Sequence, residues 1–349
     1  MGALIYAGPF AFLASIPVLY AWSDAGPFLT PASILLALLI AEHLGRDKRS
    51  TSAPSAGFRL LPVLYIPLQL LVILWAARET AQAGSAVAFV SLSLAVGVCT
   101  GVFGVLAAHE MVHSRAPWHQ VLGTLLLTGM TYPHFRIAHV YGHHRLAATG
   151  RDPSTAKLGE TFYSFLLRTL WAQWRVAWDF EKRRCRGQPP ALLHNSAVRN
   201  IIITGAVYGS SLWAWGVEAA AFLALESAIA VVVLELFNYV AHYGLSREIS
   251  DGTIEPFGNA HSWNSSGLGN LLIFNMGRHS HHHRAPSISY EGLKATRAPE
   301  LPHGYSGSIV LALIPPLWHA VMDPRASAVR ELHGELSLDN LDQPASVVP

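Results

Sequence analysis

Residues 86–113 read AVAFVSLSLAVGVCTGVFGVLAAHEMVH, an apolar run that ends in two histidines four positions apart. The run Ala86–Ala108 contains no charged residue, and a helix of about 20 apolar residues crosses the hydrocarbon core of a bilayer. Positions i and i+4 share one face of a helix, so His109 and His113 point the same way. The stretch therefore predicts a transmembrane helix that delivers two imidazoles to one edge of the membrane.

The rest of the chain has the composition of a membrane protein. Of its 349 residues 51% are hydrophobic and only 13% are charged, whereas a soluble domain carries about a quarter charged residues. Five more apolar runs have or approach membrane length, namely Ala3–Trp22, Thr30–Leu44, Leu60–Ala77, Val198–Trp215 and Ala219–Tyr239. We predict an all-α, integral-membrane bundle of about six transmembrane helices. The net charge of +2 is too small to suggest a nucleic-acid partner.

The distribution of basic residues predicts the orientation. The loop between the second and third runs carries Arg46, Lys48, Arg49 and Arg59. The stretch from Arg145 to Arg199 holds ten lysines and arginines against four acidic residues. Loops rich in lysine and arginine stay on the cytoplasmic side of a membrane. Both loops, and the histidines next to them, are therefore expected in the cytoplasm.

Two further apolar stretches are not expected to be spans. Val121–Phe135 lies between two histidine clusters that must share one side of the membrane, and Ile309–Met322 is interrupted by Pro315-Pro316. We interpret both as interfacial or buried segments that cap the bundle. Residues 1–324 then form one membrane-embedded domain with its histidine boxes within 109–283, and residues 325–349 form a polar, loosely ordered C-terminal tail.

Histidine is the residue type that carries the functional signal. The chain has 18 histidines, and half of them fall into four clusters at or just beyond the ends of apolar runs. The clusters are His109 and His113; His139, His143 and His144; His242; and His279, His282 and His283. Nine imidazoles exceed the three or four ligands of a zinc ion, so they suit two metals. Imidazole without thiolate fits iron, copper or zinc, and iron is favoured if the site activates oxygen.

The first cluster also matches a different motif. His109-Glu110-x-x-His113 is the helix signature of zinc metalloproteases, in which Glu110 would be the general base. A protease would leave the other three clusters unexplained. A membrane protein that binds metal without catalysis is a further alternative.

The clusters, their order and their setting resemble the bacterial membrane alkane 1-monooxygenases, which are relatives of xylene monooxygenase and of the integral-membrane fatty acid desaturases. The resemblance runs from about His109 to Leu293. Outside the histidine clusters it includes Asp152-Pro153, Gly159–Tyr163, Trp171–Arg184, Asn238-Tyr239, His261–Ser265 and Arg278–Ser280. These additional stretches favour the alkane branch over the desaturases.

The resemblance implies a chemistry and a cellular setting. The nine clustered histidines would hold two non-haem irons, with O2 as co-substrate and electrons from a rubredoxin or ferredoxin with its reductase. The enzyme would sit in the bacterial inner membrane and hydroxylate an unactivated C–H bond, at a terminal methyl group, of an alkane-like apolar small molecule that enters from the lipid bilayer. A methyl-arene hydroxylase or a fatty acyl desaturase or hydroxylase would use the same iron site.

Polar residues near the clusters are candidates for the hydrogen-bond partners that orient metal-bound imidazoles. They are Asp152, Glu160, Glu235, Asn238, His261, Asn264 and His281. Glu235 lies inside an apolar run, where an unpaired carboxylate is costly, so we expect either such a role or an interhelical polar contact. The chain departs from the family pattern, which usually has Glu, Asn, Glu and Asp, at Ala138, Val140, Ala241 and His281. None of these departures removes an expected ligand, but they leave the substrate the least constrained part of the assignment.

Overall fold

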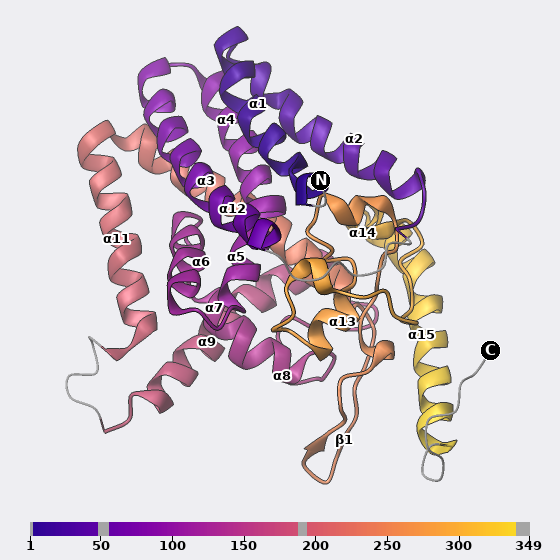
Figure 1. Ribbon diagram of the computed structural model, residues 1–349. Coiled ribbons are helices and arrows are strands. Elements are labelled where there is room, and N and C mark those ends of the chain that lie inside the picture. Colours follow the sequence, from indigo (N-terminus) through magenta and orange to yellow (C-terminus); the bar gives the residue numbers. More distant parts are fainter. Residues whose placement is uncertain (1–2, 48–55, 188–193, 340–349) are drawn as a thin grey trace.

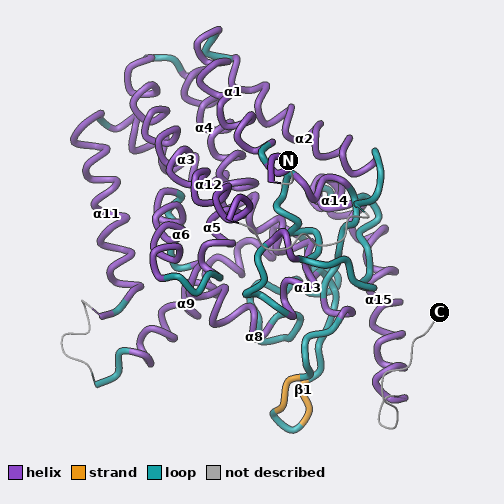
Figure 2. Tube along the Cα trace, viewed as in Figure 1, coloured by secondary structure: helices purple, strands orange, loops and turns teal. Residues whose placement is uncertain are grey.

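The regular structure of the protein is almost entirely helical. A computed structural model describes residues 3–47, 56–187 and 194–339. The two short strands β1 (Ile249–Ser250) and β2 (Thr253–Ile254) pair antiparallel in a hairpin. This hairpin projects away from the helices, on the same side as most of the loops (Figures 1 and 2).

Four helical stretches are long and apolar enough to cross a membrane, judged by length and composition within the described residues. The first combines the short helix η2 (Gly26–Phe28) with α2 (Leu29–His43). The next is α3 (Ala56–Ala83). The third joins α4 (Ala86–Cys99), the π-helical turn η3 (Thr100–Gly104) and α5 (Val105–Val112). The last is α12 (Val217–His242).

The two other expected runs are also helices. α1 (Gly8–Trp22) is apolar but shorter than the four spans. α11 (Ser196–Trp215) carries Arg199 and Asn200 in its first turns, and polar residues there lower its mean hydropathy. The prediction of an all-α membrane bundle is confirmed, and four rather than six of the described helices meet the length and composition of a span.

The outer surface of the bundle is apolar, as a lipid-facing surface must be. On α3 the leucines Leu60, Leu64, Leu68 and Leu71 recur every three or four residues and are all exposed. Such spacing places them on one side of the helix. In water this stripe would be costly, whereas acyl chains cover it without penalty.

Close contact between α4 and α12 forms the centre of the bundle. A Cβ atom added at Gly97 would lie 2.9 Å from the carbonyl oxygen of Glu226, and one added at Gly101 would lie 2.9 Å from that of Ala230. Glycines four residues apart let two membrane helices approach at backbone distance. This contact places the π-helical turn η3, which leads into α5 and His109, against α12.

Neither of the two segments that were not expected to span is among the candidate membrane helices of the described residues. α6 (Pro117–Gly129) has 13 residues and is about 20 Å long at 1.5 Å per residue, which is less than the hydrocarbon core. α14 (Gly304–Ala312) ends before the two prolines, and Pro315 begins α15 (Pro315–Asp339). A proline is tolerated in the first turn of a helix because the N–H it lacks would have no partner there.

The C-terminal segment corrects an expectation. Residues from 325 onward were expected to form a loose polar tail, but α15 continues to Asp339 across the expected domain boundary. Its buried residues Trp318, Met322 and Ala326 recur every four positions, which is the pattern of an amphipathic helix. Ala326 packs so closely that a Cβ added at Gly244 would lie 2.7 Å from it. Residues 340–349 lie outside the described residues.

Short elements collect at one end of the bundle. They are α7 (Phe135–Ile137), the π-helical turn η4 (Ala138–His143), α8 (His144–Leu146) and α13 (His279–Arg284), and they are joined by the loops that follow α12. Figure 1 shows α8 and α13 on the side of the molecule from which the hairpin projects. A buried ion pair of 2.8 Å between Arg278 and Asp47 ties this end to the segment that follows α2.

Candidate metal centre

The nine clustered histidines come together in two groups. His109, His113, His139, His144 and His282 form the five-histidine group, and His143, His242, His279 and His283 form the four-histidine group. Within each group the facing ring nitrogens all lie within 4.8 Å of one another. The four sequence clusters therefore converge on two adjacent points, and each point could hold one metal ion.

Helix geometry explains which histidine joins which group. A π-helical turn bonds residue i to i+5, so His139 and His144 converge from η4 and α8, and their Nε2 atoms lie 3.0 Å apart. The intervening His143 points to the other group. In α13, His279 and His283 are four residues apart and share a face, whereas His282 turns toward the five-histidine group.

The distances between ring nitrogens are those of shared coordination. In the five-histidine group the Nε2 atom of His139 lies 3.1 Å from that of His113 and 3.0 Å from that of His144. The Nε2 atom of His144 lies 3.2 Å from that of His282. In the four-histidine group His283 lies 3.2 Å from His242 and 3.1 Å from His279. Two nitrogens bound to one metal at about 2.1 Å are separated by about 3 Å. The spacing thus fits a metal ion held between the rings.

Several buried ring nitrogens have no protein partner within the described residues. Both nitrogens of His109 and the Nε2 atom of His143 are buried without a hydrogen bond. A buried polar atom that stays unpaired costs about 1–3 kcal/mol, so native proteins keep few of them. Metal coordination would satisfy Nε2 of His143 and one of the two nitrogens of His109, and the donor set of nine nitrogens without thiolate fits iron.

Burial keeps the imidazoles in the form that binds metal. Loss of solvation, followed by the charge of neighbouring histidines, lowers the pKa of His113 to about 3. The same two causes hold the pKa values of five more histidines well below the usual value, namely His139, His144, His279, His282 and His283. These rings are neutral near pH 7 and present a free lone pair.

Asp152 orients His143. Its Oδ2 atom lies 2.8 Å from Nδ1 of His143 and also accepts a hydrogen bond from the hydroxyl of Thr155. Burial alone would raise the pKa of Asp152, but His143 and the hydrogen bonds lower it overall. The carboxylate is therefore ionised and accepts a hydrogen bond from Nδ1–H of His143. Nε2 of His143 is then the nitrogen that faces the four-histidine group.

His242 is oriented by a backbone carbonyl. Its Nδ1 atom lies 2.9 Å from the carbonyl oxygen of His261 and must donate, so Nε2 is free to face His283. His261 therefore supports the centre through its main chain, and its ring points elsewhere. Asn264 supports α13 in turn, because its Oδ1 accepts the backbone N–H of Ser280 at 2.9 Å near the start of the helix.

Four of the other expected partners do not contact the nine histidines. Glu160, just before α9 (Phe162–Arg184), instead forms a bidentate pair with Arg168 in the second turn of that helix. Glu235 accepts hydrogen bonds from Tyr132, Gln173 and Asn238, so both Glu235 and Asn238 belong to an interhelical polar contact. His281 is a neighbour of ligands in sequence but faces outward, where its Nδ1 accepts the backbone N–H of Lys294.

Two aromatic contacts were not anticipated from the sequence. Phe135 stacks on His139 with ring centroids 4.7 Å apart, and Phe257 stacks on His283 at 4.6 Å. Phe135 precedes His139 by four residues, so helical spacing could have indicated this contact. Phe257 lies in a loop after the hairpin, and its sequence gives no comparable signal.

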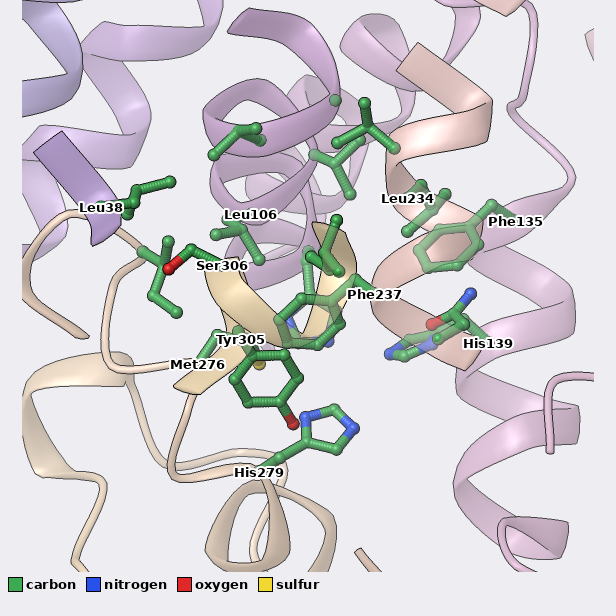
Figure 3. A pocket seen from close by; sticks show the side chains of 18 of the residues that line it. Leu38, Leu106, Phe135, His139, Leu234, Phe237, Met276, His279, Tyr305 and Ser306 are labelled. Atoms are coloured by element: carbon green, nitrogen blue, oxygen red, sulfur yellow. The ribbon is translucent and has the colours of Figure 1, made fainter. Parts of the chain in front are cut away.

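An apolar cavity reaches both groups. His109 and His139 of the five-histidine group and His279 of the four-histidine group line it, together with mainly apolar side chains that include Leu38, Val102, Leu106, Leu234, Phe237, Ile273 and Met276. Figure 3 shows His139 and His279 at the edge of this cavity. A second, more polar cavity lies against His113 and is lined by Arg59, Glu110, Ser114, Arg115 and His119.

Comparison with known proteins identifies the family. Residues 84–308 match the fatty acid desaturase family model. The chain is 36% identical over 311 residues to alkane 1-monooxygenase 1 of Pseudomonas aeruginosa, covering 84% of this chain and 80% of that protein. This chain belongs to the alkane 1-monooxygenase family.

Other relatives agree with this family assignment. Alkane 1-monooxygenase 2 of Pseudomonas aeruginosa is 35% identical over 338 residues, which cover 90% of this chain and 89% of that protein. The xylene/toluene monooxygenase hydroxylase component of Pseudomonas putida is 26% identical over 307 residues, 87% of this chain and 81% of that one.

Membership of the alkane 1-monooxygenase family makes the chain a membrane monooxygenase, which is an oxidoreductase. The zinc-protease alternative is therefore wrong. His109 and His113 lie in a set of nine histidines rather than in a three-ligand site, so their spacing around Glu110 matches the protease motif without its function. The alternative of a metal-binding protein without catalysis is excluded in the same way.

Proposed function

We propose that this enzyme hydroxylates a terminal methyl group of an alkane-like molecule. The reaction consumes one O2, two electrons and two protons and yields an alcohol and one water. The observation that carries the proposal is the apolar cavity that reaches His109, His139 and His279, and therefore both histidine groups. The similarity to two alkane 1-monooxygenases over most of the chain supports the same substrate class.

The metal assignment follows from the grouping of the histidines. One iron would be held by the five-histidine group and a second by the four-histidine group. When bound, the two irons supply the redox chemistry that lets oxygen attack an unactivated C–H bond. Burial keeps six of the nine ligands neutral, and Asp152 and the carbonyl oxygen of His261 orient two of the nine.

The cavity contributes binding and the exclusion of water. A saturated hydrocarbon offers no hydrogen-bonding group, so its binding free energy comes from burial of apolar surface at about 25 cal/mol per Å². Side chains such as Leu106, Leu234 and Phe237 supply the matching surface. A chain lying along them would bring one end toward His139 and His279 at the edge of the cavity (Figure 3).

Identification of the product tests this function. Bacterial cells that produce the chain with an electron donor are given octane under ¹⁸O2, and extracts are analysed by mass spectrometry. We expect 1-octanol that contains one ¹⁸O atom, and none from cells that carry His109→Ala. Alkene without alcohol would refute hydroxylation.

Para-xylene is the competing substrate, because the similarity to the xylene/toluene component makes a methyl-arene hydroxylase the second candidate. If the cells convert para-xylene but not octane, the enzyme is a methyl-arene hydroxylase.

The two electrons require a protein partner, and we propose a rubredoxin or a ferredoxin with its reductase. The polar cavity beside His113 supports a docking site for an acidic carrier, because Arg59 and Arg115 line it and opposite charge accelerates association. Purified enzyme supplied with each carrier in turn would show which one sustains turnover.

We propose that the centre faces the cytoplasm from the bacterial inner membrane. The basic residues that flank it support this orientation. Reporter fusions after Leu44 and within the Arg145–Arg199 loop should give cytoplasmic signals, and a fusion near Gly26 should give a periplasmic signal. A periplasmic signal from the loop would contradict the orientation. His144 directly precedes this loop and would then lie on the periplasmic side.

A further inference from the structure

A third cluster of ligand-type side chains lies outside the nine histidines. It consists of Glu255, His261 and His333, which come from the loop after β2, from η5 (Asn259–His261) and from α15. Nε2 of His333 lies 2.9 Å from Oε1 of Glu255 and 3.2 Å from Nε2 of His261. His261 is fully buried, and Glu255 and His333 are about three-quarters buried.

The hydrogen bonds of His261 argue against a metal at this cluster. The backbone N–H of Gly258 donates to Nδ1 of His261 at 2.9 Å, so Nδ1 carries a lone pair and the proton of the neutral ring is on Nε2. A metal at Nε2 of the neutral ring would require that proton to move to Nδ1, where it would break the hydrogen bond from Gly258. In the metal centre the pattern is the reverse, because Nδ1 of His143 and of His242 both donate.

The same cluster places a carboxylate beside two imidazoles, one of which donates to it. Nε2–H of His333 points at Oε1 of Glu255, and Nε2 of His261 lies 3.5 Å from Oε2. The backbone N–H of Glu248 also donates to Oε2 at 3.1 Å. Glu255 thereby links the base of the hairpin, the buried ring of His261 and the C-terminal helix α15.

The main chain next to this link contacts the metal centre directly. The carbonyl oxygen of His261 is the acceptor for Nδ1 of His242. The following residues are fixed to the end of α12, because Ser262 and Trp263 both donate to the carbonyl oxygen of Ala241, at 3.1 and 2.9 Å. Any shift of the His261 backbone would therefore turn the ring of His242 within the four-histidine group.

We propose that His333 and Glu255 are positioning residues for His242 and act through His261. The C-terminal helix is then a part of the metal centre's support, although its histidine lies 50 residues beyond the last ligand, His283. The inference rests on the proposed function, since it assigns the four-histidine group to one of two irons. It predicts that damage to this link loosens that iron and leaves the other one in place.

Resistance to a chelator tests the link. Wild type, His333→Ala, His333→Gln and Arg330→Ala are purified in detergent, and iron per chain is followed during exposure to one chelator concentration. We expect His333→Ala to lose one of its two irons about tenfold faster, the lower end of the roughly 10–100-fold effect of removing a ligand's direct hydrogen-bond partner, because His333 acts through His261. The side-chain amide of His333→Gln can still donate to Glu255, so it should restore most of the retention. Arg330 is exposed on the same helix, and its variant should match wild type.

A spectroscopic measurement and a second variant separate positioning from folding. The Mössbauer spectrum of ⁵⁷Fe-loaded His333→Ala should change in one of its two iron components, with the unfolding temperature measured in parallel. Glu255→Gln, which removes charge but keeps a carbonyl acceptor, should lose the same iron at an intermediate rate. If both His333→Ala and Glu255→Gln lost iron no faster than wild type, the proposal would be overturned.

Two other outcomes are equally decisive. A zinc ion bound in addition to two irons, and lost in both His333→Ala and His333→Gln, would show that the cluster is a metal site, because glutamine is a poor zinc ligand. Wild-type enzyme without two irons would refute the proposed function itself, and the positioning role with it. Wild type with two irons and unaltered variants would refute the positioning role alone.

Discussion

His144→Ala and His282→Ala are each expected to abolish hydroxylation and to lower the iron content of the purified enzyme. His144 lies 3.0 Å from His139 and 3.2 Å from His282 through their Nε2 atoms, so each residue is a link in the five-histidine group. Removing either ring opens a coordination position. Because loss of an outer hydrogen-bond partner alone costs about 10–100-fold, loss of a ligand should cost more than about 100-fold in turnover.

His281→Ala is the matched control. His281 directly precedes His282, is less buried than its neighbours and faces Lys294 rather than either group, so this variant should keep its iron and its activity. All three variants should insert into the membrane normally, because the spans depend on apolar length and on loop charge. Full hydroxylase activity in His144→Ala or His282→Ala would remove that residue from the centre.

Asp152→Ala is expected to weaken iron binding and turnover by about 10–100-fold. The variant removes the acceptor for Nδ1 of His143, so the ring can rotate and its proton can move to the nitrogen that faces the metal. Asp152→Asn should recover part of the loss, because its carbonyl oxygen can still accept that proton but carries no charge. Iron content and product formation, measured on the same membranes, report both effects.

An exposed aspartate on α9 controls for the loss of an acidic side chain. Asp179 is exposed, so Asp179→Ala should match wild type in both measurements. Asp152 also accepts hydrogen bonds from Thr155 and from the backbone N–H of Ser154, and the unfolding temperature of each variant shows how much the loop itself is weakened. Normal iron content in Asp152→Ala would contradict the role assigned to this carboxylate.

The membrane bundle and the nine histidines could be predicted because their signals are local. Uncharged apolar runs predict spans, and helical spacing aims His109 and His113 in one direction. The division into groups of five and four could not be predicted, because the adjacent residues His143 and His144 enter different groups. That division depends on the π-helical turn η4, which distinguishes positions i+4 and i+5 and has no clear signature in the sequence.

The hydrogen-bond partners of the ligands were harder to predict, because they depend on tertiary contacts. Asp152 lies nine residues after His143 and contacts it through a loop. Glu235 lies two helical turns before His242, but it faces Tyr132 and Gln173. The partner of His242 is a backbone carbonyl, which no side-chain pattern reveals.

The departures from the family pattern are consistent with this arrangement. Ala138 and Ala241 are buried beside His139 and His242, at positions where the family usually has glutamate. These small apolar side chains offer no hydrogen bond to an imidazole. In this chain Asp152 orients His143, and the carbonyl oxygen of His261 orients His242. These two ligands are therefore held in place without the two glutamates.

The metal content of an active preparation tests the central claim most directly. Enzyme purified from cells grown with both iron and zinc is analysed by elemental mass spectrometry, and the same sample is assayed for hydroxylation. Nine imidazoles in two groups predict close to two irons per chain, with activity that disappears as a chelator removes them. An active sample that contains a single zinc ion and no iron would contradict the account.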